Sequence, residues 1–110
     1  MKLTNRENAY IPPGKITAYL LSETHSVGKS KAKLLRSNGF HEGNTALLEK
    51  ALLTIAQSED IVDSILSPHG VKYVIDGTIQ TPDGGYIRMW TIWIIDEGGE
   101  NPRFVTAYPV

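Results

Sequence analysis

Cysteine is absent from the 110 residues of the sequence. Its absence excludes a disulfide scaffold, a thiolate metal site and a cysteine nucleophile. Long apolar runs are absent as well, since none approaches the roughly 18 residues that a membrane span needs. Residues 1–8 also lack the apolar core of a signal peptide. We therefore expect a cytoplasmic protein with no membrane partner.

The familiar ligand-binding motifs are missing too. The sequence has no metal-ligand spacing, dinucleotide fingerprint or nucleophile elbow. The tripeptide Gly28-Lys29-Ser30 matches the end of a phosphate-binding loop, but the first glycine of that motif is missing and no predicted strand precedes it. We therefore expect neither a metal nor a cofactor.

Neither positive nor negative charge predominates in the sequence, which has 11 lysines and arginines and 12 aspartates and glutamates. The net charge is −1 at pH 7, so the chain as a whole does not attract nucleic acid. One local excess lies between Gly28 and Asn38, where four cations occur with no carboxylate among them: Lys29, Lys31, Lys33 and Arg36. Such a cluster most often forms the solvated outer face of a helix, and otherwise marks a local site for an anion.

What the sequence does contain is typical of one globular domain, residues 1–110, with 41% hydrophobic and 21% charged residues. Its first half predicts three helices. The first covers about 13–21, and the second follows a cap at Ser30 and stops at Asn38-Gly39. The third has the strongest helical period and runs from a cap at Asn44 or Thr45 to about Gln57.

The second half is rich in β-branched and aromatic residues and predicts four strands. They run from Ile61 to Leu66, Val71 to Ile79, Tyr86 to Ile95 and Arg103 to Tyr108. Short breaks rich in glycine and proline favour antiparallel neighbours. The sequence thus predicts an α+β fold, with about three N-terminal helices packed on a C-terminal four-stranded antiparallel sheet.

Polar residues in the predicted strands are candidates for a site. Strand alternation places Thr106 and Tyr108 on one face, together with Phe104. Thr91 is either a satisfied core hydroxyl or part of a site. Lys72 either protects an edge of the sheet or points into a cleft.

Six separated segments, in order along nearly the whole chain, carry a resemblance to a known family. They read KITAYLL at 15–21, HSVGKSKA at 25–32, NGF at 38–40, GVKY at 70–73, WTIWIID at 90–96 and PRFVTAYP at 102–109. With them the chain resembles a bacterial family catalogued as a domain of unknown function. The order of its elements is similar to that of the small nuclease domains of phage head-morphogenesis proteins and polymorphic toxins, which are grouped with the barnase, EndoU, colicin and RelE ribonucleases. Ser26 stands where the usual motif has a proline after the histidine.

The resemblance implies an active site on the sheet face, at the positions His25, Lys31, Lys72, Thr91, Arg103, Thr106 and Tyr108. His25 would be a general acid or base, because imidazoles titrate near neutral pH, although it could also be a simple loop histidine. The catalytic set would be His25, Lys31, Lys72, Thr106 and Tyr108, and the substrate-binding set Lys29, Thr91 and Arg103. Which of Lys29 and Lys31 faces the site is left open.

The function predicted in this way is that of a metal-independent endoribonuclease, in which the ribose 2′-hydroxyl attacks the adjacent phosphate. RNA would be its substrate, and a cognate antitoxin protein its partner in a toxin–antitoxin pair. The alternative is a non-catalytic protein-binding module, either antitoxin-like or immunity-like or a degenerate nuclease fold. This alternative accounts more simply for the net charge of −1.

Overall fold

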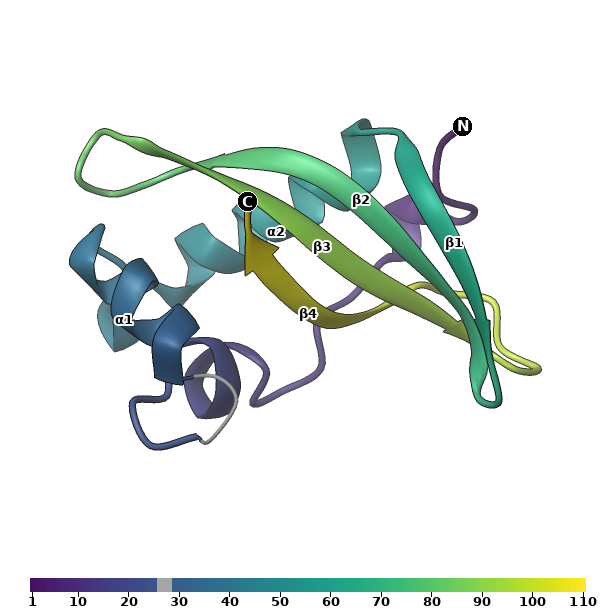
Figure 1. Ribbon diagram of the computed structural model, residues 1–110, viewed down its shortest axis with the longest axis horizontal. Helices are drawn as coiled ribbons and strands as arrows, with labels where there is room; N and C mark the ends of the chain where they lie inside the picture. The colour runs from purple at the N-terminus through teal and green to yellow at the C-terminus, as the bar shows by residue number, and fades with distance from the viewer. Residues whose placement is uncertain (26–28) are drawn as a thin grey trace.

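The computed structural model describes residues 1–25 and 29–110. Its first half holds the helical elements, which are η1 (Arg6–Asn8), η2 (Ile16–Leu20), α1 (Lys29–Ser37), η3 (Glu42–Asn44) and α2 (Thr45–Ser58). The second half holds the strands β1 (Ile61–Ser67), β2 (Gly70–Gln80), β3 (Tyr86–Asp96) and β4 (Arg103–Pro109). Figure 1 shows this division of the chain, which confirms the predicted α+β fold.

The four strands form one antiparallel sheet in the order β1-β2-β3-β4. Their bounds lie within two residues of the predicted ones, because turn residues mark the ends of the strands. Gly70 has a φ of 145°, and a Cβ there would lie 2.2 Å from the Ile95 carbonyl oxygen. Only glycine fits the turn between β1 and β2 without a backbone shift.

The first two helices differ from the predicted ones at their starts. The segment expected to be helical at 13–21 is shorter and has wide π-type turns over Ile16–Leu20. Ser30 does not cap α1, because the Lys29 N–H already donates to the His25 carbonyl at 3.0 Å. The predicted left-handed stop is confirmed at Gly39, which has a φ of 101°.

The predicted entry loop to the basic helix, Ser26 to Gly28, lies outside the described residues. The third predicted helix is confirmed as α2. None of the described helices is long and apolar enough to cross a membrane.

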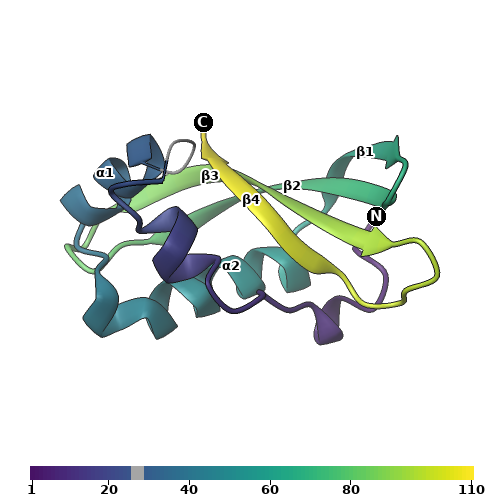
Figure 2. The same ribbon diagram turned by 90° about the horizontal axis from the view of Figure 1, so that it is seen from below.

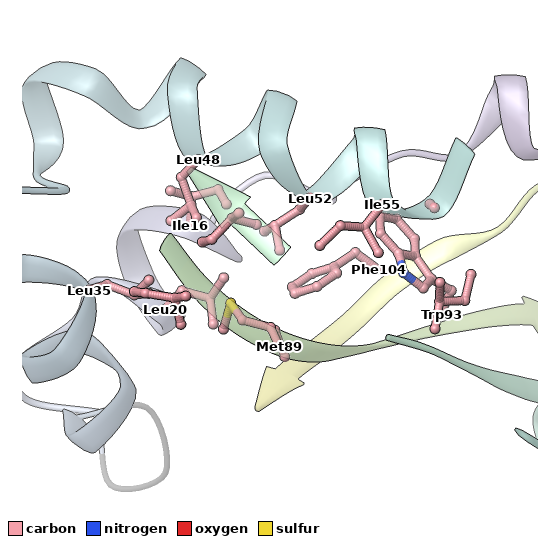
Figure 3. Packing of buried hydrophobic residues seen from close by; sticks show 14 of the residues in the cluster. Ile16, Leu20, Leu35, Leu48, Leu52, Ile55, Met89, Trp93 and Phe104 are labelled. Carbon is pink, nitrogen blue, oxygen red and sulfur yellow. The ribbon is translucent and has the colours of Figure 1, made fainter. Parts of the chain in front are cut away.

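The core lies between α2 and one face of the sheet. Figure 2 shows α2 running along beneath the strands, and in Figure 3 its apolar side chains point at residues of β3 and β4. Leu48, Leu52 and Ile55 are almost fully buried, and each such burial contributes about 1.5–3 kcal/mol. The rings of Trp93 and Phe104 meet edge to face at 5.2 Å.

A β-bulge in β4 changes the predicted alternation of that strand. Thr106 pairs with Ile92, whereas Phe104 pairs with Trp93, so Val105 has no partner in β3. Because Ile92 and Trp93 are consecutive, Phe104 and Thr106 point to opposite faces. The prediction that these two residues share a face is therefore wrong: Phe104 enters the core, while Thr106 and Tyr108 point away from α2.

Gly77 allows α2 to approach β2 closely, and this contact can be tested. A Cβ at Gly77 would lie 2.6–2.9 Å from three side-chain carbons of Ile55, which is itself buried and cannot swing into solvent. Gly77→Ala should therefore lower the free energy of unfolding by about 1–3 kcal/mol, as measured by urea denaturation.

The Ile55→Ala background provides the matched control. The same Gly77→Ala change should cost clearly less there, since the obstructing carbons are gone. Equal costs in both backgrounds would contradict the close contact.

Candidate functional site

Lys31 is a buried cation in the first half of α1. Its side chain is only 8% exposed, and its Nζ donates to the Tyr19 hydroxyl at 2.7 Å and to Thr106 Oγ1 at 2.8 Å. Within residues 1–25 and 29–110, no carboxylate forms an ion pair with it. The Lys31 ammonium thus donates its hydrogen bonds to neutral hydroxyl oxygens and not to an anion.

The phase of α1 explains why this lysine turns inward. Lys31 lies one turn before the buried Leu35 and beside the buried Ala32, so all three share the packed face of the helix. Lys29 and Lys33 are exposed. The expectation that all four cations form a solvated face is therefore wrong for Lys31.

Three elements far apart in the chain supply the cluster around Lys31. Tyr19 comes from η2 and Thr106 from β4, and their hydroxyl oxygens lie 2.7 Å apart. The β4 bulge turns Thr106 and Tyr108 to the same side, and Lys31 Nζ lies 4.3 Å from the centre of the Tyr108 ring. The result is a closed triangle of Lys31, Tyr19 and Thr106 with a cation–π contact on one side.

Two further side chains surround the Tyr19 ring. Lys15 Nζ lies 5.1 Å from the ring centre and donates to the Val105 carbonyl at 3.0 Å. The His25 ring meets Tyr19 edge-on at 5.0 Å. Lys15, Lys31 and His25 therefore all lie about 5 Å from the centre of the Tyr19 ring.

These side chains border an open pocket of about 590 Å³ between η2 and β4. Its walls are formed by Pro12, Pro13, Gly14, Lys15, Ala18, Tyr19, His25, Val105 and Thr106. Tyr19 and Thr106 of the triangle thus line an open pocket, whereas Lys31 is not one of its lining residues.

The electrostatics of the cluster act on the Tyr19 phenol. Burial by itself raises the pKa of Tyr19 and is the largest single influence. The hydrogen bonds with Lys31 and Thr106, together with the charges of Lys31 and Lys15, outweigh burial and lower the pKa below its ordinary value of 10.0. Tyr19 is therefore a better proton donor near neutral pH than a free tyrosine.

Comparison of the sequence with known protein families identifies one match. Residues 2–110 match a family described as "Domain of unknown function (DUF6883)". The chain belongs to the DUF6883 family. This confirms the predicted membership of a family catalogued as a domain of unknown function.

A solved structure shares the fold of this DUF6883 chain. It is a contact-dependent growth inhibition toxin–immunity protein complex from Klebsiella pneumoniae 342, similar with a TM-score of 0.74 and 17% sequence identity. The likeness covers 96% of each chain. No curated protein matches the chain in sequence.

Four of the residues singled out in the sequence lie together in the structure: His25, Lys31, Thr106 and Tyr108. Lys29 does not join them. It lies on the exposed side of α1, on a separate surface with Lys33 and Arg36. The choice between Lys29 and Lys31 is thereby resolved in favour of Lys31.

The other three residues form no hydrogen bond or ring contact with Tyr19, Lys31 or Thr106 in the described part of the chain. Lys72 is in β2, two strands away from β4, and pairs with Ile94, which lies two residues or about 7 Å along β3 from the partner of Thr106. Arg103 forms an ion pair with Asp96 at 2.8 Å. Thr91 is a core hydroxyl: it donates to the Ile75 carbonyl at 3.0 Å and accepts from the Trp93 indole at 2.9 Å.

Sequence reasoning missed Lys15 and Tyr19. The helix predicted at about 13–21 contains both residues, but Tyr19 counts there among its apolar positions and Lys15 is not singled out. The signal was present in the first of the six segments, because a lysine and a tyrosine four residues apart share a face of a helical turn.

The influence of Lys31 on Tyr19 gives a direct prediction. In Lys31→Met the pKa of Tyr19 should rise, because the hydrogen bond and the positive charge are lost while the burial remains. An NMR titration with ¹³C-labelled tyrosine measures this, with the Tyr19 signal assigned from Tyr19→Phe.

Lys29→Met is the matched control, since it removes an exposed lysine from the same helix and should leave the pKa of Tyr19 unchanged. An identical pKa in the wild type and in Lys31→Met would show that the ammonium does not act on the phenol.

Proposed function

We propose that this DUF6883 chain is an endoribonuclease that cleaves RNA without a metal, through attack of the ribose 2′-hydroxyl on the adjacent phosphate. Lys31 is the observation that carries the proposal. Buried charges in proteins are normally paired with opposite charges, yet Lys31 has two hydroxyls and a ring for neighbours, beside an open pocket. A phosphate entering the pocket supplies the missing anion.

The side chains around the pocket supply the groups that the reaction needs. As the O2′–P bond forms and the P–O5′ bond breaks, a base accepts the 2′-hydroxyl proton and an acid protonates the leaving O5′. His25 is the proposed base. Tyr19 is the proposed acid, because its pKa is lowered. The products are a 2′,3′-cyclic phosphate and a 5′-hydroxyl.

The remaining residues of the cluster act on charge and orientation. Lys31 and Lys15 stabilise the negative charge that develops on the phosphate oxygens. Thr106 orients Lys31 and Tyr19 through its two hydrogen bonds, and Tyr108 holds the ammonium over its ring. Lys29, Lys72, Thr91 and Arg103 have no part in this reaction.

We further propose that the nuclease is a toxin with a cognate protein inhibitor. One chain of the growth inhibition toxin–immunity complex has the same fold, which supports a role in a toxin system on either the toxin or the immunity side. The similarity in order of elements to toxin nucleases favours the toxin side. The inhibitor would cover the pocket or its surroundings.

Cleavage of RNA by the purified chain tests the reaction. Lys31→Met should lower the cleavage rate by about 10²–10³-fold, because a buried donor to the developing charge is lost. His25→Ala should lower it by about 10²–10⁴-fold. Lys29→Met is the matched control and should retain the wild-type rate, and thermal melting shows whether each variant is folded.

Substrate and metal controls define the chemistry. An RNA substrate with 2′-deoxyribose at the cleaved position should remain intact, because it lacks the 2′-hydroxyl nucleophile. EDTA should not change the rate of cleavage of the normal substrate. Cleavage of the deoxy substrate, or loss of activity in EDTA, would refute the proposed reaction.

Inducible expression in a bacterial host tests the biological role. The wild type should arrest growth and degrade RNA, whereas a His25→Ala, Lys31→Ala double variant should do neither. Healthy growth with intact RNA in both strains, together with stoichiometric recovery of a protein partner, would favour the non-catalytic binding module instead.

A further inference from the structure

The sheet face that points away from α2 carries two exposed aromatic side chains beside the Lys31 cluster. Trp90 in β3 pairs directly with Tyr108 in β4, and both are 45% exposed. Side chains of directly paired residues lie on one face, with Cβ atoms about 4.5–5.5 Å apart. Trp90 and Tyr108 are therefore neighbouring exposed aromatic side chains on the same face of the sheet.

The charged residues next to Trp90 pair with each other, so they leave no net negative charge on this surface. Trp90 lies directly opposite Asp76 of β2 in the sheet. The Asp76 carboxylate accepts from Arg88 Nε at 3.0 Å. The charge of Asp76 is thus balanced by Arg88, and the exposed part of the Trp90 ring is apolar.

We propose that Trp90 and Tyr108 form a stacking site for a base of single-stranded RNA, next to the phosphate site at Lys31; this inference rests on the proposed nuclease function. Tyr108 joins the two sites, because its ring lies 4.3 Å from Lys31 Nζ. A cation beside an aromatic surface matches the charged phosphate and the flat base of a nucleotide. The bases must be unpaired, since only splayed bases can stack on side chains.

Such a surface would compensate for the low net charge of the chain. With a net charge of −1, long-range attraction of the RNA backbone contributes little. Stacking gives affinity that does not depend on net charge, and it accepts any base because every base has a π-face. The site would therefore select single-stranded RNA over duplex RNA with little preference for sequence.

Binding of a short single-stranded RNA with 2′-fluoro sugars, which cannot be cleaved, tests the stacking site. Trp90→Ala should weaken binding by about 5- to 100-fold, and Trp90→Phe should retain most of it. Tyr86→Ala is the matched control. Tyr86 is 70% exposed on the same face of β3, but it lies about 13 Å from Trp90 along the strand, so its loss should change binding less than twofold.

Intrinsic fluorescence supplies an independent readout. The chain has two tryptophans, and Trp93 is fully buried while Trp90 is exposed, so quenching by the RNA should report Trp90 alone. Inorganic polyphosphate serves as a probe without bases, and its binding should be the same for the wild type and Trp90→Ala. Equal weakening for both probes, or equal effects of Trp90→Ala and Tyr86→Ala, overturns the stacking site.

The outcomes separate this inference from the proposed nuclease. If the wild type cleaves RNA and folded Trp90→Ala binds the 2′-fluoro RNA normally, stacking is wrong and the nuclease stands. If the wild type neither binds nor cleaves RNA, both are wrong. If Trp90→Ala loses a protein partner while RNA binding is unchanged, the surface is a protein interface and not a base site.

Discussion

The β-bulge at Val105 determines which side chains of β4 reach the candidate site. One unpaired residue reverses the alternation of the strand, so that Phe104 packs on Trp93 in the core while Thr106 and Tyr108 point to the opposite side. The carbonyl of the bulge residue, Val105, accepts a hydrogen bond from Lys15 Nζ. Core packing, the hydroxyl that holds Lys31 and the anchor of Lys15 thus depend on a single extra residue, and bulges commonly re-aim side chains near active sites.

Burial of the Lys31 ammonium carries a desolvation penalty for folding. Moving an ammonium from water into a protein interior carries a penalty of several kcal/mol, which two hydroxyls and an aromatic ring offset only in part. An apolar residue at position 31 would pack on the same helix face as Leu35 without that desolvation penalty. The same arrangement lowers the pKa of Tyr19, and a perturbed pKa beside a pocket is a feature that functional sites share.

Much of the fold could be predicted from the sequence, whereas only part of the site could. Glycine and proline mark the strand ends in the sequence itself, so the sheet was predicted almost to the residue. The bulge at Val105 has no comparable marker, because it arises from packing between distant elements. The inward turn of Lys31 depends on the helix phase to a single residue, and the pairing of Arg103 with Asp96 depends on the turn that brings their strands together.

The low net charge of the chain does not conflict with an anion site, because three of its arginines have a different role from Lys15 and Lys31. Arg36 pairs with Glu23 and Glu42, Arg88 with Asp76 and Arg103 with Asp96, so these cations neutralise carboxylates elsewhere on the surface. Lys15 and Lys31 bond instead to oxygens that carry no charge. The local field at the pocket is therefore positive although the sum over the chain is not. A site built in this way attracts an anion only at short range, so recognition of a polyanion has to rely on contacts with its uncharged parts.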